Sequence, residues 1–305
     1  MSRWGRGGRS RFLSEQDPAT GLVRGALRRA TMRVQLPPTL ILRGAVGLAV
    51  LFVLVCPASP AQAMTPVIRD LSKGTINWTT MDLCASAEES NSSGSMAGYE
   101  ALEGRARATL GPRMLDLARE VVIDSSHTSG DLMSSTEAVA DKLDANVSLW
   151  EVTEARYHTS GRVEVEVCLP IHAWLRPALS RMGAGVDRSS PPEVPISGLI
   201  VDARGLELTP AISPEVRTAT GALLYSAASM TSFAASQRAP VIYVTDPADP
   251  VAVRRSGEQP LIVRAASVAE DVNLVLDPSD GVALEKAMSE SGFLAQGTVV
   301  IVVDR

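Results

Sequence analysis

The sequence is poor in lysine, histidine and aromatic residues. Only 4% of its 305 residues are aromatic, it has three histidines, and only two lysines lie beyond Lys73. The chain has 29 basic and 34 acidic residues, of which nine arginines and two acidic residues lie in the first 63. Residues 64–305 therefore carry 20 basic and 32 acidic residues. Nucleic-acid binding depends on clustered Lys and Arg, so the composition argues against a nucleic-acid partner. A hydrophobic content of 45% over this length predicts a globular chain with room for two domains.

The sequence also lacks a hydrophobic run long enough for a membrane span. Its apolar stretch at residues 45–55 is about 11 residues long, whereas a spanning helix needs about 20. Arginines precede this stretch and Ala61-Gln62-Ala63 follows it, which is typical of a signal peptide. We predict that residues 1–63 are a targeting segment cleaved after Ala63. The mature protein would then have no membrane span. It would be periplasmic or secreted, and association with the outer membrane is a further alternative.

Two features of the leader leave alternatives. The segment before Met32 is unusually long for a signal peptide, so translation is predicted to begin at Met32, with Met1 as the alternative. Cys56 could carry a lipid anchor, but Val55 precedes it where a lipobox has Gly, Ala or Ser. Lipidation of Cys56 is therefore the less favoured interpretation.

Cleavage would leave two cysteines, Cys84 and Cys168. In an oxidising compartment a disulfide between them would persist, although isolated cysteines are also common as small buried side chains. Both interpretations stay open. The alternation of residues 162–169 places Cys168 on the polar face of a strand, which favours pairing or exposure.

The amino-terminal half shows alternating strand and helix patterns. The predicted elements are a strand at 74–84, a polar loop at 88–98, a helix from Leu102 to Val121 that is kinked or restarted at Gly111-Pro112, a helix begun by a Ser134/Glu137 capping box, and a hairpin of strands 147–157 and 162–169.

A proline-rich segment, residues 188–195, predicts a linker to a second region. The elements predicted beyond it are strands at 199–201, 241–244 and 261–263, a hairpin at 216–225, a helix at 280–291 with Val282, Leu284, Ala287 and Met288 inward, and a central strand at 298–303. The predicted fold class is α/β (α+β), with one domain at 70–187 and another at 196–305. Each domain would be an antiparallel or mixed sheet packed with helices.

No pattern in the sequence indicates a metal site, a cofactor or a catalytic group. His127, His158 and His172 lack the i, i+4 spacing that brings two imidazoles to one helix face. The acidic segments 246–249 and 277–280 are interpreted as turn and helix-cap residues rather than Ca²⁺ ligands. We therefore predict no metal, no cofactor and no enzymatic activity.

The most distinctive string surrounds Asp202, Arg204 and Gly205, directly after a predicted buried strand. These three residues are the candidate binding site. An Asp/Arg pair at a strand end could be catalytic. The favoured interpretation is that Arg204 neutralises Asp202 or binds backbone carbonyls.

The string SGLIVDARGLELTPAISPEV, with GTINWT and VSLWEVTEARYHTSGRVEVEVCLPI, resembles secreted bacterial proteins related to FlgT-type flagellar assembly proteins and small outer-membrane lipoproteins. The resemblance covers nearly all of residues 74–304. The interruption at Gly111-Pro112 and the poor lipobox depart from that pattern. The resemblance implies a non-enzymatic structural or assembly factor with envelope or flagellar protein partners. The alternative is a periplasmic hydrolase or ligand-binding protein that uses Asp202 and Arg204. The oligomeric state stays open.

Overall fold

The computed structural model describes residues 65–90, 98–184 and 196–305. The predicted leader with Ala63, Cys56 and both candidate start residues lies outside the described residues, as does the predicted linker 188–195. All described elements belong to one compact unit. They form two sheets packed with helices, one antiparallel and one mixed, so the predicted α/β fold class is confirmed.

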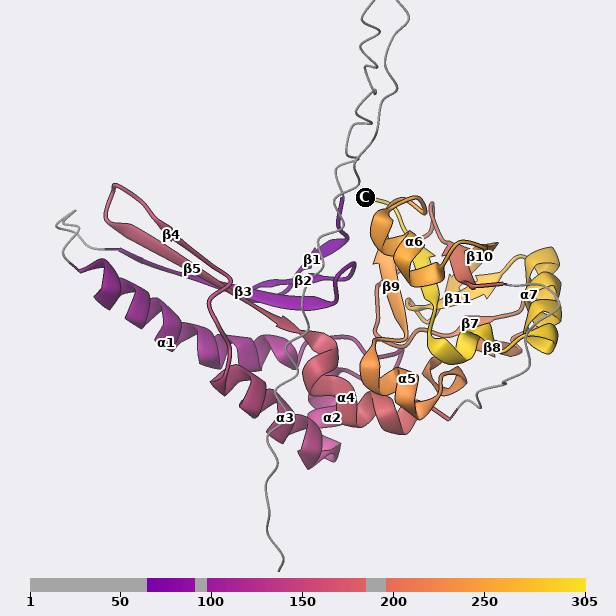
Figure 1. The fold of residues 1–305 in the computed structure, drawn as a ribbon, viewed down its shortest axis with the longest axis horizontal. Helices are drawn as coiled ribbons and strands as arrows, with labels where there is room; N and C mark the ends of the chain where they lie inside the picture. Colours follow the sequence, from indigo (N-terminus) through magenta and orange to yellow (C-terminus); the bar gives the residue numbers. More distant parts are fainter. Residues whose placement is uncertain (1–64, 91–97, 185–195) are drawn as a thin grey trace, which may run out of the picture. The chain divides into compact units, whose positions relative to one another are not determined.

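The first sheet is antiparallel and has the strand order β1-β2-β3-β5-β4. Its strands are β1 (Ile68–Asp70), β2 (Thr75–Asn77), β3 (Asp82–Ser90), β4 (Glu154–Tyr157) and β5 (Arg162–Pro170). Its helices are α1 (Tyr99–Ala118), α2 (Ser129–Ser135), α3 (Glu137–Ser148) and α4 (Ile171–Met182). Helix α1 runs along β3 and β5 (Figure 1) and contacts both strands, and the valines of β5 are buried in the predicted alternation.

The predicted single strand at 74–84 is wrong, because a tight turn divides it into β2 and β3. The Asn77 side chain accepts hydrogen bonds from the backbone N–H groups of Thr79 (3.0 Å) and Thr80 (3.1 Å), which is the turn chemistry that Asn supplies. Met81 completes the turn with φ 60°, a left-handed conformation that is uncommon outside glycine.

Helix α1 is continuous, so the predicted restart at Gly111-Pro112 is wrong, whereas the alternative of a kink there stays a prediction. Leu102, Ala106 and Leu110 lie buried on one face, and the spacing continues through Met114. Pro112 cannot donate to the carbonyl four residues earlier, that of Ala108, but both residues lie on the exposed face. Solvent can hydrate the freed carbonyl there, and packing of the buried face holds the helix together.

The capping box was predicted at the wrong place. It is formed by Thr128 and Asp131 at the start of α2, where the Thr128 N–H donates to Asp131 Oδ2 at 2.7 Å. Helix α3 instead begins at Glu137, after Thr136. It extends to Ser148 because Val139, Leu143 and Val147 bury at helical spacing. The predicted strand at 147–157 is therefore wrong over its first part, and only β4 (Glu154–Tyr157) forms within it.

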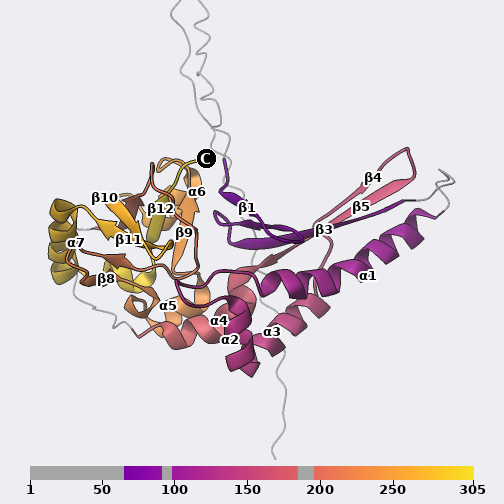
Figure 2. The same cartoon turned by 180° about the vertical axis from the view of Figure 1, so that it is seen from behind.

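The second sheet has seven strands in the order β8-β7-β11-β10-β6-β12-β9. Figure 2 labels five of them, β8, β9, β10, β11 and β12. Its strands are β6 (Gly198–Asp202), β7 (Val216–Arg217), β8 (Leu223–Tyr225), β9 (Val241–Val244), β10 (Pro260–Ala269), β11 (Asn273–Leu276) and β12 (Val299–Val302). Its helical segments are η1 (Ala227–Ser229), α5 (Ser232–Gln237), α6 (Pro250–Ser256), α7 (Pro278–Glu290) and η2 (Phe293–Gln296). Strands β10, β6, β12 and β9 are mutually parallel, and all four residues of β12 are buried, as predicted for a central strand.

Two details of this half differ from the prediction. Strand β10 is longer than the predicted 261–263, and it forms an antiparallel hairpin with β11, which the sequence did not suggest. In α7, Leu284 and Ala287 are buried as expected, but Val282 is 66% exposed and was wrongly placed inward.

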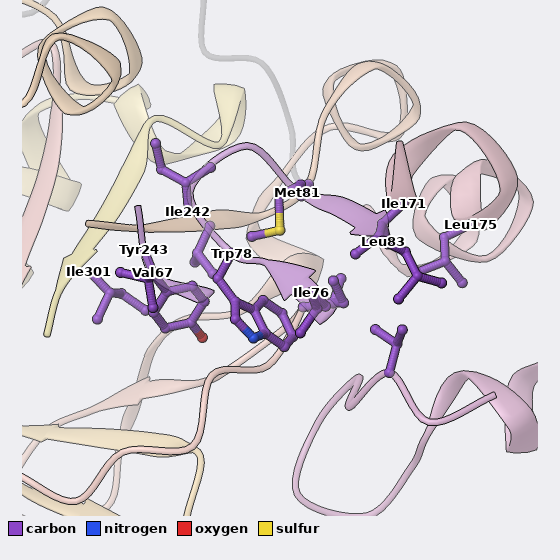
Figure 3. Packing of buried hydrophobic residues seen from close by; sticks show 14 of the residues in the cluster. Val67, Ile76, Trp78, Met81, Leu83, Ile171, Leu175, Ile242, Tyr243 and Ile301 are labelled. Carbon is purple, nitrogen blue, oxygen red and sulfur yellow. The ribbon is translucent and has the colours of Figure 1, made fainter. Parts of the chain in front are cut away.

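The two sheets share one buried hydrophobic cluster. The Trp78 and Tyr243 side chains lie next to each other in this cluster (Figure 3). The two rings pack edge-on with 5.6 Å between their centroids. The Tyr243 N–H donates to the Trp78 carbonyl at 3.1 Å, and Thr79 Oγ1 donates to the Tyr243 carbonyl at 2.7 Å. These backbone contacts cover β9, the strand at the edge of the second sheet, which would otherwise present unpaired N–H and C=O groups.

Candidate functional site

The candidate residues lie at the carboxyl ends of the parallel strands. Asp202 is the last residue of β6, in register with Arg264 of β10 on one side and Val302 of β12 on the other. Open sheets with parallel strands usually bind ligands outside these ends, because several strands deliver their following loops to one place.

Asp202 and Arg204 bind each other. Arg204 Nε donates to Asp202 Oδ1 at 2.9 Å, Arg204 Nη2 donates to Asp202 Oδ2 at 2.6 Å, and the Arg204 N–H also donates to Oδ1 at 3.1 Å. The hydrogen bond from Arg204 lowers the pKa of the Asp202 carboxyl against the opposing effect of its partial burial. The same contact raises the pKa of Arg204. Both groups therefore stay charged and bonded to one another at neutral pH, as the favoured sequence interpretation expected.

Gly205 turns the chain after this pair. Its φ is +81°, a region that L side chains rarely adopt, and its N–H donates to Asp304 Oδ2 at 2.6 Å. Asp304 follows β12, so this hydrogen bond joins the loops after two neighbouring parallel strands.

A hollow of about 620 Å³ opens beside these loops, and we call it the strand-end hollow. Residues 206–210 after β6 and 303–305 after β12 line it, and Ile76, Trp78 and Val121 form part of its apolar wall. Asp202 and Arg204 are not among its lining residues, whereas Asp304, the partner of Gly205, is.

The histidines lie apart from this edge. His127 Nδ1 lies 3.0 Å from Asp124 Oδ1 on an exposed loop, and His158 lies beside Arg162 at the β4–β5 turn. His172, on α4, is half-buried, and burial lowers its pKa so that it is neutral at pH 7. The three histidines thus have different surroundings and do not form a cluster among the described residues.

Cys84 and Cys168 form a disulfide, which resolves the open question about the two thiols. They face each other across β3 and β5 at register-matched positions, with 4.1 Å between their Cα atoms. Among the described residues, the one group of three potential metal ligands is this pair with Glu166, and both sulfur atoms are committed to the covalent bond.

The acidic segments at 246–249 and 277–280 mostly serve as turn and cap residues. Asp249 Oδ1 accepts from the Val251 N–H at 2.7 Å at the start of α6, and Asp246 Oδ1 accepts from the Ala248 N–H at 2.8 Å. Asp280 is different, since its Oδ2 accepts from the Arg264 N–H at 2.6 Å and so ties α7 to β10.

One feature near the strand-end hollow was missed from the sequence. Glu270 (φ 51°) and Asp271 (φ 62°) form the β10–β11 turn in the left-handed region without a glycine, and Asp271 lines the hollow. Such turns usually carry Asn-Gly or Asp-Gly, so Glu-Asp gave no signal. Backbone strain of this kind is concentrated at functional sites in proteins.

Residues 198–305 match the model of the family described as "Treponema pallidum Tp0624, second domain". The matched segment contains the whole second sheet, including the Asp202-Arg204-Gly205 motif. No curated protein matches the chain. Across the part of the chain that the structure describes, no helix is both long and apolar enough to cross a bilayer. The second sheet of this chain is therefore similar to a domain found in a spirochaete protein.

Proposed function

We propose that this chain is a non-enzymatic exported protein of the cell envelope that acts as a structural or assembly factor. The Cys84–Cys168 disulfide is the observation that carries the proposal, because structural disulfides persist in oxidising compartments and are rare in the cytosol. The short apolar stretch at 45–55 supports the same route, since it has the length and flanks of a signal peptide.

The state of the Asp202–Arg204 pair supports a non-enzymatic role. A general acid or base needs a pKa near the working pH, and the pKa of Asp202 is shifted the other way by Arg204. An arginine held by a carboxylate through two hydrogen bonds has its charge neutralised and its binding edge occupied, so it would attract a substrate anion only weakly. The alternative, a periplasmic hydrolase that uses this pair, would lose activity in Asp202→Ala while keeping its fold.

The sheet face opposite α1 offers a surface for protein partners. Glu88 of β3 is paired in register with Glu164 of β5, and Glu166 lies two residues further along the same face of β5. Arg156 of β4 lies next to Glu164. Two of these carboxylates are ion-paired on the same sheet, Glu88 with Arg162 at 3.2 Å and Glu164 with Arg156 at 3.6 Å. The surface therefore presents charges of both signs, which would suit a protein partner with a complementary charge pattern. The resemblance to FlgT-type flagellar assembly proteins favours an assembly partner in the envelope, which would include flagellar components.

Site-specific crosslinking in cells tests the proposal. A photo-crosslinking residue placed at Glu164 should capture an envelope protein, and the same residue at Glu285, an exposed position on α7, should not. Fractionation of the same cells should place the protein outside the cytoplasm. Recovery in the cytosol with free thiols, or identical adducts from both positions, would contradict the proposed role.

A further inference from the structure

The strand-end hollow combines an apolar wall with a rim of acidic side chains. We propose that it binds an organic cation, meaning an ammonium or guanidinium group carried on an alkyl chain. This inference goes beyond the structural role and does not depend on it, because the hollow would bind such a cation whatever the compartment or partner of the protein.

The size and position of the hollow suit a small ligand or a single side chain. Its volume of about 620 Å³ lies within the usual range of about 300–1,000 Å³ for small-molecule pockets. It opens at the carboxyl ends of β6 and β12, where their following loops are joined by the bond from the Gly205 N–H to Asp304. Both loops are thus held in place before a ligand arrives.

The charge of the rim selects a cation. Five lining residues are acidic and two, Arg69 and Arg305, are basic, so the hollow carries an excess of negative charge. The acidic ones are Asp70, Glu120, Glu207, Asp271 and Asp304. Among the described residues none of these five takes part in an ion pair. None of the five is therefore committed to a salt bridge, although the charge of Asp304 contributes to the raised pKa of Arg204.

Two of the carboxylates are fixed by the protein, and two extend freely. Glu120 accepts from the Ser72 N–H at 3.1 Å, and Asp304 accepts from the Gly205 N–H at 2.6 Å. Glu207 and Asp271 are exposed at the rim, on the loop after β6 and on the strained β10–β11 turn. The Thr209 N–H donates to the Asp271 carbonyl at 2.8 Å, which holds these two segments together.

The apolar wall explains why the cation would need an alkyl chain. Leu71, Val122 and Leu206 line the hollow with partly exposed apolar side chains. Ile76, Trp78 and Val121 also line it but are almost fully buried, so they supply the shape of the wall rather than its exposed area. A bare inorganic cation would leave this wall hydrated, whereas an alkyl chain would remove apolar surface from water. Arginine and lysine side chains, and free alkylamines, have this combination of a charged head and an apolar stem.

Calorimetry on the purified protein with its disulfide intact tests the inference. The probes are agmatine, which is a free guanidinium alkylamine, an acetylated and amidated Ala-Arg-Ala tripeptide, and the same tripeptide with uncharged citrulline in place of arginine. At least one cationic probe should bind with a dissociation constant below about 1 mM, and the citrulline peptide should bind at least tenfold more weakly. Tighter binding of agmatine would identify a free amine as the source of the cation. Tighter binding of the arginine peptide would identify a partner side chain.

The variant Glu207→Gln/Asp271→Asn should weaken binding of the cationic probe at least tenfold, because it removes two carboxylates while keeping their shape. Asn tolerates the positive φ at position 271, so the turn should be retained. Glu285→Gln on α7 is the matched control and should bind like the unchanged protein. If the double variant fails to fold, the single variants and a loss of affinity with added salt take its place. Absence of binding by both cations, or equal binding by the citrulline peptide or the double variant, would overturn the inference.

Discussion

Reduction of the Cys84–Cys168 disulfide should lower the free energy of unfolding by about 4–5 kcal/mol. The two cysteines are 84 residues apart, and the chain-entropy relation gives this magnitude for a closed loop of that length. The effect arises in the unfolded state, because the cross-link restricts the conformations of the unfolded chain.

The folded state should survive reduction. Strands β3 and β5 are paired from Asp82↔Pro170 to Ser90↔Arg162, so the disulfide is one link in a ladder that continues beyond it in both directions. The Val163, Val165 and Val167 side chains are buried on the strand that α1 contacts, and this packing does not require the sulfur atoms to be bonded.

Urea denaturation followed by circular dichroism, with and without reductant, measures the change. With an m-value of about 2–3 kcal/mol/M, the midpoint should fall by about 1.5–2.5 M on reduction. The Cys84→Ser/Cys168→Ser variant should show the lower midpoint in both conditions, which separates loss of the bond from other effects of the reductant. A change below about 1 kcal/mol, or loss of the native spectrum of the reduced protein without urea, would refute the reasoning.

Three further predictions concern single residues. Asp271→Gly should stabilise the protein by about 0.5–1 kcal/mol in thermal denaturation, since glycine adopts the observed φ of 62° without strain. An unchanged melting temperature would count against strain in this turn. Arg204→Gln should raise the pKa of the Asp202 carboxyl, which carboxyl NMR titration measures. The stability that depends on ionised Asp202 would then be lost at a higher pH as the solution is acidified. An unchanged pKa would contradict the role given to the ion pair. Tyr243→Phe should destabilise the fold by about 1–3 kcal/mol in urea denaturation, because it removes two hydrogen bonds of a buried hydroxyl. This hydroxyl accepts from the Ala211 N–H at 2.9 Å and donates to the Ala211 carbonyl at 2.8 Å. An unchanged stability would show that the Ala211 groups find other partners.

The sequence predicted those elements whose local pattern agrees with their final environment. The alternation at 162–169 placed β5 and its two faces, and the unbroken apolar run at 298–303 indicated a strand buried on both sides. Where local preference and packing disagreed, the prediction was wrong. Packing carried α1 through Pro112 and extended α3 over the β-branched Val147, because each buried face continues at helical spacing.

The residues of the candidate site also fall into those that the sequence indicated and those that only the tertiary structure brought together. The sequence alone identified Asp202, Arg204 and Gly205 and the oxidisable pair Cys84 and Cys168, because a strand-end motif and a cysteine count are local or countable features. Only the tertiary structure decided that the two cysteines face each other across β3 and β5, since pairing depends on strand register. It also decided that Trp78, Glu207 and Asp271 line one hollow, because residues far apart in the chain come together only when both sheets pack on a common core.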